Sequence, residues 1–137
     1  MKKVPSCSES TLLALWRKVV RKEWGSSCAM CGANESGGEL EIHHIVKRRC
    51  KLLKFDPQNG IPVHVGPCHE AANLAAPRLI PAKQYDYLQY WRGVSFKQYL
   101  VDEGITEDEW RKWIKESLTA ALDRTLSNKW ASGPADL

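Results

Sequence analysis

The 137-residue chain has no long hydrophobic run, and this absence excludes a membrane-spanning protein. No stretch approaches the roughly 18 consecutive apolar residues that a transmembrane helix needs. Two lysines near the N-terminus are followed by Val4 to Glu9, a short polar segment where a signal peptide would have its apolar core. We therefore expect no membrane association, no export and a cytoplasmic location.

The chain also lacks the setting in which cysteines form disulfides. It has five cysteines but no export signal, and disulfides are rare in proteins that stay in the cytoplasm. Cys28 and Cys31 form a Cys-x2-Cys pair, which is typical of metal binding. Cys7 lies outside every motif, and we predict that it is a free thiol.

Length and composition favour one globular domain, residues 1–137. The 43% hydrophobic and 26% charged residues are ordinary for such a domain, and the length falls within the usual range of roughly 100 to 200 residues. We predict an α+β fold that is mostly helical. It comprises an N-terminal helix over 10–24, a metal-binding core over 28–76 and a C-terminal helical layer over 82–128.

Positive charge is concentrated in the first part of the chain. Residues 1–54 hold eleven Lys and Arg against five Glu, whereas residues 55–137 hold nine against eleven acids. Five of these cations form a short run, Lys47, Arg48, Arg49, Lys51 and Lys54. Such a run can contact the phosphates of a polyanion, although runs of charge are also typical of solvated loops. We predict that these side chains bind nucleic acid.

All four histidines fall between residues 43 and 69. They occur in the frame Cys28-x2-Cys31, His43-His44, Asn59 and His64-x3-Cys68-His69. Residues 40–46 alternate as a strand does, residues 56–60 carry turn residues, residues 61–65 form a second apolar run, and helix-forming residues follow from position 68. The predicted order is therefore strand, turn, strand, helix.

Residues 28–74, with these motifs in this order, resemble the HNH endonuclease family. The resemblance implies a ββα-metal (His-Me finger) core that a structural zinc ion stiffens. It also implies a metal-dependent hydrolase that nicks or cuts double-stranded DNA in a bacterial or phage-infected host cell. Such an enzyme could serve phage packaging or recombination, restriction or defence, or a mobile element, and the sequence does not choose among these. The expected partner is DNA.

The zinc ligands follow the family pattern only in part. Cys28 and Cys31 are the first two ligands, but the position where the family has the first cysteine of a second pair holds Val65. His64, one residue earlier, would complete a Cys3His set with Cys68, which is a normal zinc set. Cys50 is the rival fourth ligand. The remaining alternative is that no zinc binds and His64 is an ordinary strand residue.

The paired histidines carry the predicted chemistry. By resemblance, His43 binds the catalytic cation and His44 is the general base, a role that suits histidine because its pKa lies near neutrality. Neighbouring strand residues point to opposite faces, so we expect a distortion at the strand end. Without the surrounding frame, the pair would be read as two surface histidines.

Three further residues complete the predicted catalytic site. By resemblance, Asn59 holds the loop between the strands and so orients the base, although Asn before Gly is also good turn chemistry. His69 and Asn73 lie four residues apart on one helix face and would hold the cation with His43. Few protein ligands suit Mg²⁺ or Mn²⁺, whereas imidazoles also suit Ni²⁺ or Zn²⁺. Glu41 shares the strand face of His43 and is a weaker candidate.

The C-terminal third is predicted to be helical over 82–90, over 96–101 and from a capping box at Thr106–Glu109 to about Ser127. Six apolar residues mark the predicted buried face of the last helix: Trp110, Trp113, Ile114, Leu118, Ala121 and Leu122. These helices could also bind a protein partner or a second copy of the chain. Residues 131–137 are predicted to be a frayed tail.

A second function of another class stays open. In it, the cysteines hold a zinc-stabilised module that binds nucleic acid or protein, and the histidines have no chemical role. The joint presence of His43, His44, Asn59 and His69 favours the endonuclease.

Overall fold

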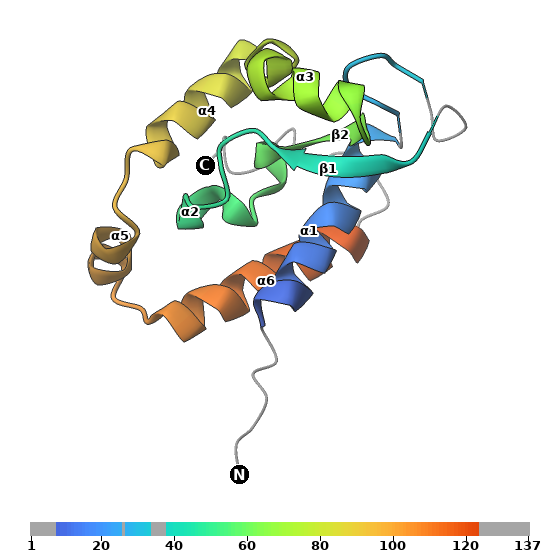
Figure 1. The fold of residues 1–137 in the computed structure, drawn as a ribbon. Helices are drawn as coiled ribbons and strands as arrows, with labels where there is room; N and C mark the ends of the chain where they lie inside the picture. The colour runs from blue at the N-terminus through green and yellow to red at the C-terminus, as the bar shows by residue number, and fades with distance from the viewer. Residues whose placement is uncertain (1–7, 26, 34–37, 124–137) are drawn as a thin grey trace.

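The computed structural model describes residues 8–25, 27–33 and 38–123. Within these residues the protein is mostly helical with one two-stranded antiparallel sheet, as the α+β prediction requires. Figure 1 shows helices arranged around the sheet, with α1 and α6 on one side and α3 and α4 on the other. Cys7, the residues after 123 and the predicted tail at 131–137 lie outside the described residues.

The elements follow the predicted order with small shifts at their ends. They are α1 (Glu9–Trp24), β1 (Leu40–His44), α2 (Lys51–Lys54), η2 (Pro57–Asn59), β2 (Gly60–His64), α3 (Pro67–Ala75), η3 (Ala76–Arg78), α4 (Ala82–Arg92), α5 (Phe96–Glu103) and α6 (Glu107–Asp123). The basic run contains the short helix α2. The predicted turn before β2 contains the 3₁₀ helix η2.

Helix α1 has defined signals at both ends. The Ser8 side chain accepts a hydrogen bond from the Thr11 N–H at 3.2 Å, which satisfies one free donor of the first turn. Gly25 ends the helix in the left-handed region, at φ +73°. Between these ends, one face of the helix is buried, and it comprises Leu12, Leu13, Trp16, Val19 and Val20.

The two strands pair with Leu40 opposite His64 and His44 opposite Gly60. The pair lies between α1 and α3, and every residue of β2 is buried. The sheet therefore has two chemically different ends. One end carries His64, and the other carries the His43-His44 pair.

Two apolar clusters hold the fold together. The first joins α1 to α6 and contains Leu12, Leu13, Trp16, Val19, Val20, Ile42, Phe55, Trp110, Leu118 and Ala121. The second joins the sheet to α3 and α4 and contains Cys28, Leu40, Val46, Leu53, Ile61, Val63, Ala72, Ala76, Ile80 and Leu88. The strands contribute to both clusters, so side chains at the strand ends are held from two sides.

Helix α6 begins with the predicted capping box. The Thr106 hydroxyl accepts from the Glu109 N–H at 3.1 Å, and the Glu109 carboxylate accepts from the Thr106 N–H at 2.9 Å. Trp113, however, is 47% exposed, so its predicted burial is wrong. At about 100° per residue, position 113 falls about 100° from the centre of the face that carries Trp110 and Leu118.

Helices α1 and α6 are also tied together at the end of α6. The Lys22 ammonium donates to the carbonyl oxygens of Ala121 at 3.2 Å and Leu122 at 2.6 Å. A cation at the C-terminal end of a helix is favourable because the last carbonyls carry partial negative charge.

None of the described helices combines the length and apolar character that crossing a lipid bilayer would require.

Candidate functional site

Cys28, Cys31, His64 and Cys68 lie together, with one ligand atom of each within 4.8 Å of all the others. The Nδ1 atom of His64 lies 3.3 Å from the Cys31 sulfur and 3.9 Å from the Cys68 sulfur. Tetrahedral zinc, with Zn–S of about 2.3 Å and Zn–N of about 2.0–2.1 Å, separates such atoms by about 3.5 Å. The cluster can therefore hold a metal such as zinc. Cys50, the rival ligand, does not belong to it.

A compact turn presents the first two thiols. The Cys28 carbonyl accepts from the Gly32 N–H at 2.8 Å, and the Cys28 sulfur accepts from the Cys31 N–H at 3.5 Å. Gly32 has φ +80°, a conformation that side chains disfavour. The Ala29 N–H donates to the carbonyl of Pro62 at 2.7 Å and so fastens the turn to β2. Local backbone bonds thus carry the thiols to the strand that ends in His64.

The thiols influence one another electrostatically. Burial raises the pKa of Cys28, but hydrogen bonds from backbone N–H groups outweigh burial and lower it to about 7. Burial and the neighbouring Cys28 raise the pKa of Cys68 to about 11, because a second thiolate beside a first is repelled. A divalent cation offsets this repulsion, so the donor set fits zinc.

Along β1, a cleft of about 590 Å³ is lined by His43, His44, His69 and Asn73, and its lining extends back to Glu39. The structure therefore brings together the residues predicted to hold the catalytic cation and the predicted base. The rings of His43 and His69 meet edge to face, with centroids 4.9 Å apart. Among the described residues, however, the only cluster of three or more His, Cys, Asp or Glu ligand atoms is the one formed by Cys28, Cys31, His64 and Cys68.

His44 and His43 point to opposite faces of β1, as strand geometry predicts. The His43 ring meets His69 of α3, whereas the His44 ring stacks on Trp16 of α1, with centroids 4.0 Å apart and planes 11° apart. Both side chains nevertheless line the cleft. The chain bends away directly after His44, where the strand ends.

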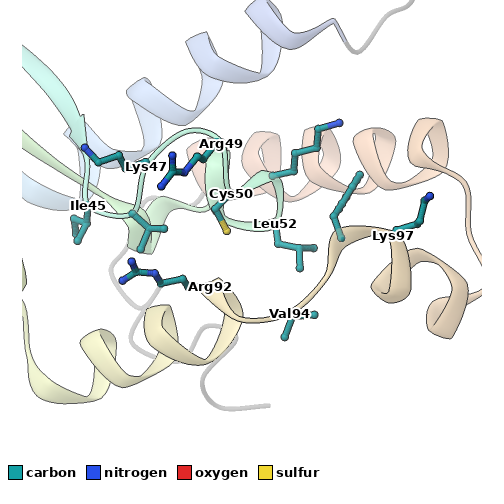
Figure 2. Close-up of a pocket in the computed structure, with 11 residues that line it drawn as sticks. Ile45, Lys47, Arg49, Cys50, Leu52, Arg92, Val94 and Lys97 are labelled. Atoms are coloured by element: carbon teal, nitrogen blue, oxygen red, sulfur yellow. The ribbon is translucent and has the colours of Figure 1, made fainter.

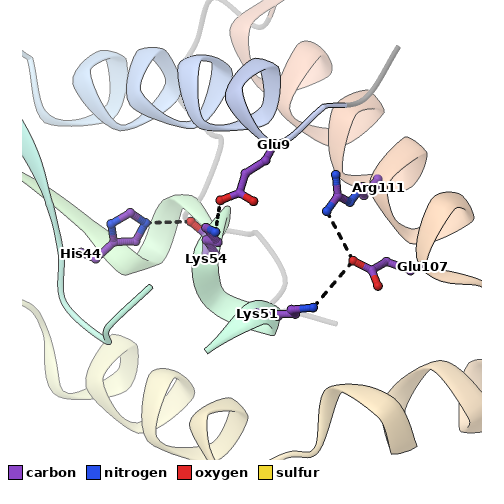
Figure 3. A network of polar contacts seen from close by, with 6 residues as sticks. All are labelled: Glu9, His44, Lys51, Lys54, Glu107 and Arg111. Atoms are coloured by element: carbon purple, nitrogen blue, oxygen red, sulfur yellow. Dashed lines mark hydrogen bonds and ion pairs between the residues drawn. The ribbon is translucent and has the colours of Figure 1, made fainter. Parts of the chain in front are cut away.

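One nitrogen of His44 is held by the backbone. Its Nε2 lies 2.9 Å from the carbonyl oxygen of Lys54, and Figure 3 shows this contact beside the Lys54 side chain. A carbonyl oxygen only accepts, so Nε2 carries the proton and Nδ1 has the free lone pair. Burial lowers the pKa of His44 to about 4 against the opposing effect of the Lys54 carbonyl, and Arg48 lowers it further. The imidazole is therefore neutral at pH 7.

Trp16 is a residue of the site that the sequence analysis did not identify. Its indole N–H donates to the carbonyl oxygen of Asp56 at 2.8 Å, while its ring supports His44. A Cβ at Gly60 would lie 2.7 Å from the Trp16 ring, so only glycine lets the ring pack this closely on β2. Helical periodicity cannot distinguish such a tryptophan from an ordinary core residue.

His69 has a carboxylate partner. Its Nδ1 pairs with Glu41 of β1, which leaves Nε2 as the nitrogen available to a cation. A carboxylate that holds the other nitrogen of a histidine is common behind metal ligands, because it fixes the ring and raises its basicity. Burial lowers the pKa of His43, and the neighbouring His69 and Lys47 lower it further, which favours the neutral form that metals require.

Asn59 is fully buried and joins two parts of the segment that follows β1. Its Oδ1 accepts from the Val46 N–H at 2.6 Å, and its Nδ2 donates to the carbonyls of Val46 and Leu53 at 3.0 Å each. Lys54, whose carbonyl contacts His44, directly follows Leu53. The backbone bonding expected for Asn59 is therefore present, and it ends one residue from the contact that holds His44.

The basic run divides between different surroundings. Lys47 and Arg48 line the histidine cleft. The Lys54 ammonium pairs with Glu9, and Lys51 lies 3.9 Å from the Glu107 carboxylate, which also contacts Arg111 at 3.4 Å (Figure 3). The five predicted cations therefore do not form one uniform surface.

Comparison with protein-family models, with curated proteins and with solved structures finds no match to this chain. The function is therefore argued from the chemistry of these residues.

Proposed function

We propose that this protein is a metal-dependent HNH endonuclease that hydrolyses phosphodiester bonds of double-stranded DNA. In this proposal β1, β2 and α3 are the two strands and the helix of a ββα-metal core. One observation carries the proposal: His43, His44, His69 and Asn73 line a single cleft. Lys47 and Arg48 line the same cleft and add the positive charge that a phosphodiester requires.

His44 is the proposed general base. Its Nδ1 takes the proton of a water molecule while the water oxygen forms a bond to phosphorus and a phosphorus–oxygen ester bond breaks. The Lys54 carbonyl supports this role because it keeps the other ring proton on Nε2. The Trp16 ring supports it as well, since the electron-rich face of an indole stabilises the imidazolium that forms.

Asn59 and Trp16 are positioning residues in this proposal, because neither is placed against the substrate. Asn59 fixes the segment that ends in the Lys54 carbonyl. Trp16 fixes the opposite face of the His44 ring and is itself held by Asp56. The base is therefore held in one orientation before DNA binds, which lowers the entropic cost of reaching the reactive geometry.

His43, His69 and Asn73 would hold the catalytic cation. A bound Mg²⁺ or Mn²⁺ supplies positive charge to the phosphate and the leaving oxygen. The neutral His43 ring and the Glu41 contact that frees Nε2 of His69 fit such an ion. Zinc is proposed at the other cluster, where Cys28, Cys31, His64 and Cys68 offer a complete tetrahedral donor set.

Plasmid nicking tests the proposal. Zinc-loaded wild type and His44→Ala are compared with Mg²⁺, Mn²⁺ or Ni²⁺ added. We expect nicking by the wild type and a rate about 10²- to 10⁴-fold lower for the variant, because general-base catalysis contributes about that much. Zinc content and the melting temperature are measured alongside, so that unfolding of the variant is recognised. A folded, zinc-loaded His44→Ala protein that cuts at the wild-type rate would refute the mechanism.

A zinc-stabilised binding module is the second candidate function. One observation favours it, namely that the zinc cluster is the only complete multi-ligand cluster among the described residues. Its signature would be DNA or protein binding by a wild-type preparation that cuts no plasmid with any of the three cations.

A further inference from the structure

A second hollow of about 640 Å³ lies beside the basic run, on the side of the helices α4 and α5. One wall is the segment from Ile45 to Leu52, and the other is the junction of α4 and α5. Figure 2 shows the side chains of Arg49 and Arg92 coming from opposite walls, with Cys50 between the two backbone segments. We refer to this hollow as the helix-junction pocket.

The helix-junction pocket is strongly cationic. Five of its lining residues carry positive charge, and none of the described lining residues is acidic: the cations are Lys47, Arg49, Lys51, Arg92 and Lys97. The polar contacts at its edges are weak. Lys51 lies 3.9 Å from Glu107, and Arg92 donates to the side-chain oxygen of Gln89 at 3.4 Å. Like charges gathered in a concave surface focus positive potential, which an anion relieves.

Two further features of the pocket favour an anion. Helix α5 begins there, with Phe96 and Lys97 in its first turn, and that turn contains no acidic residue. The N-terminal end of a helix carries partial positive charge and attracts anions. The Lys51 ammonium also lies 5.4 Å above the Phe96 ring, which holds it at the pocket wall.

The helix-junction pocket and the histidine cleft share a wall. Ile45 and Lys47 line both hollows, whereas Arg48 faces the cleft and Arg49 faces the pocket. Neighbouring cations of one short segment, Arg48 and Arg49, therefore line two adjacent hollows. A linear polyanion that leaves the cleft past Lys47 meets the pocket next, whereas a single small anion would occupy only one of the two.

We propose that the helix-junction pocket binds the phosphodiester backbone of DNA that flanks the scissile bond. This inference rests on the proposed function only for the position of the cut, because the pocket would bind the backbone without any hydrolysis. Arg92 and Lys97 become binding residues that lie about 40 positions beyond the basic run in the sequence. In this proposal the DNA-binding surface therefore extends from the basic run onto the helices α4 and α5.

Binding measurements test this proposal in a background that cannot cut. Zinc-loaded His44→Ala protein is titrated with a fluorescently labelled DNA duplex in chelator-free buffer without added Mg²⁺, over a series of salt concentrations. The pocket variant carries Arg92→Gln and Lys97→Gln. The matched control carries Lys83→Gln and Lys112→Gln, two exposed cations that line neither hollow and give the same change in net charge.

We expect the pocket variant to bind a long duplex about tenfold more weakly than the control and to lower the salt-dependence slope by nearly 2, since each lost phosphate contact removes about 0.9. A duplex too short to extend past the cleft should show no difference. Equal affinities and slopes for both proteins on the long duplex would overturn the proposal. Inorganic pyrophosphate is titrated in parallel as a small-anion probe. If the pocket variant lost affinity for pyrophosphate but not for the long duplex, the proposal would also be overturned, because the pocket would then bind a small anion.

Cys50 provides a readout that needs no pocket variant. It lines the pocket and is partly buried, so DNA seated there should slow its alkylation by iodoacetamide. The measurement uses zinc-loaded protein with Cys7→Ser, and mass spectrometry identifies the alkylated position. We expect at least a severalfold slower reaction with the long duplex. An unchanged rate at saturating DNA would count against the proposal, whether or not the protein cuts.

Discussion

The Cys28, Cys31, His64 and Cys68 cluster lies at one end of the strand pair, whereas the histidine cleft runs along β1, and the two sites differ in how complete they are. Four ligand atoms of the cluster lie within 4.8 Å of one another. In the cleft, His43 and His69 approach edge to face, but the described residues assemble no such cluster. His69 and its partner Glu41 are also more than a third exposed. Structural zinc sites are closed by protein ligands, whereas catalytic sites keep positions open.

The difference follows from what holds each set of side chains. The cysteines are placed by the backbone bonds of a short turn and by β2, so their positions come from local structure. The cleft residues come from β1, α1 and α3, and the histidines among them are placed by partners from other elements, such as Trp16 for His44. The cluster should therefore depend on metal, and the cleft should depend on packing.

Removal of zinc should have the largest effect. Zinc contributes about 10–16 kcal/mol in zinc-finger peptides, which is comparable to the whole stability of a domain at about 5–15 kcal/mol. We expect Cys31→Ser or a strong chelator to abolish cooperative thermal unfolding. Cys50→Ser is the matched control and should keep one zinc per chain. A Cys31→Ser protein with wild-type melting would show that the fold does not depend on the cluster.

Replacing Gly60 with alanine should disrupt the packing of Trp16 beside His44 and leave zinc binding unchanged. A Cβ at this position meets the Trp16 ring at 2.7 Å, so Gly60→Ala forces that ring away from β2. Overpacking of this kind costs about 1–3 kcal/mol, measured as the free energy of unfolding in urea. Gly93→Ala, whose Cβ would meet only the Tyr90 carbonyl at 3.7 Å, should cost less. Equal losses for the two variants would contradict the close packing described at Trp16.

Under the proposed function, removing the charge of Glu41 should weaken the binding of the catalytic cation and leave zinc binding unchanged. Glu41→Gln leaves a neutral partner for His69, and loss of such a partner typically costs 10- to 100-fold in metal affinity. Calorimetric titration of zinc-loaded protein with Mn²⁺ gives the affinity, and Glu39→Gln, in the same cleft, is the control. Wild-type Mn²⁺ affinity in Glu41→Gln would exclude a supporting role for this carboxylate. Zinc content should not change.

The smallest effect is expected at Asp56, which holds Trp16 through its backbone and Tyr87 through its side chain. Burial raises the pKa of Asp56, so its protonated form is favoured in the folded state. The resulting stabilisation is present below the unfolded-state pKa and is lost as pH rises through the folded-state pKa. We therefore expect the stability of Asp56→Asn relative to wild type to increase from pH 4 to pH 8. Urea unfolding across this range tests the sign, and a decrease would contradict the raised pKa.

The sequence predicted what depends on local spacing and missed what depends on tertiary contact. The helix α1, the capping box at Thr106 and the two strands each have signals within a few residues. The cysteine spacing also led to His64, which the structure places with the thiols. The stack of Trp16 on His44 and the approach of Arg92 to Arg49 join residues roughly 30 to 40 positions apart. No short-range pattern contains such pairs.

Helix α3 carries Cys68 and His69 as consecutive residues, and each faces a different cluster. The first turn of α3 therefore connects the Cys28, Cys31, His64 and Cys68 cluster with the histidine cleft. A chain that has not acquired zinc would lack the anchor at Cys68, so the first turn of α3 would be held only by the contact of His69 with Glu41 and by the packing of Ala72. Under the proposed function, zinc binding would then strengthen the binding of the catalytic cation at His69.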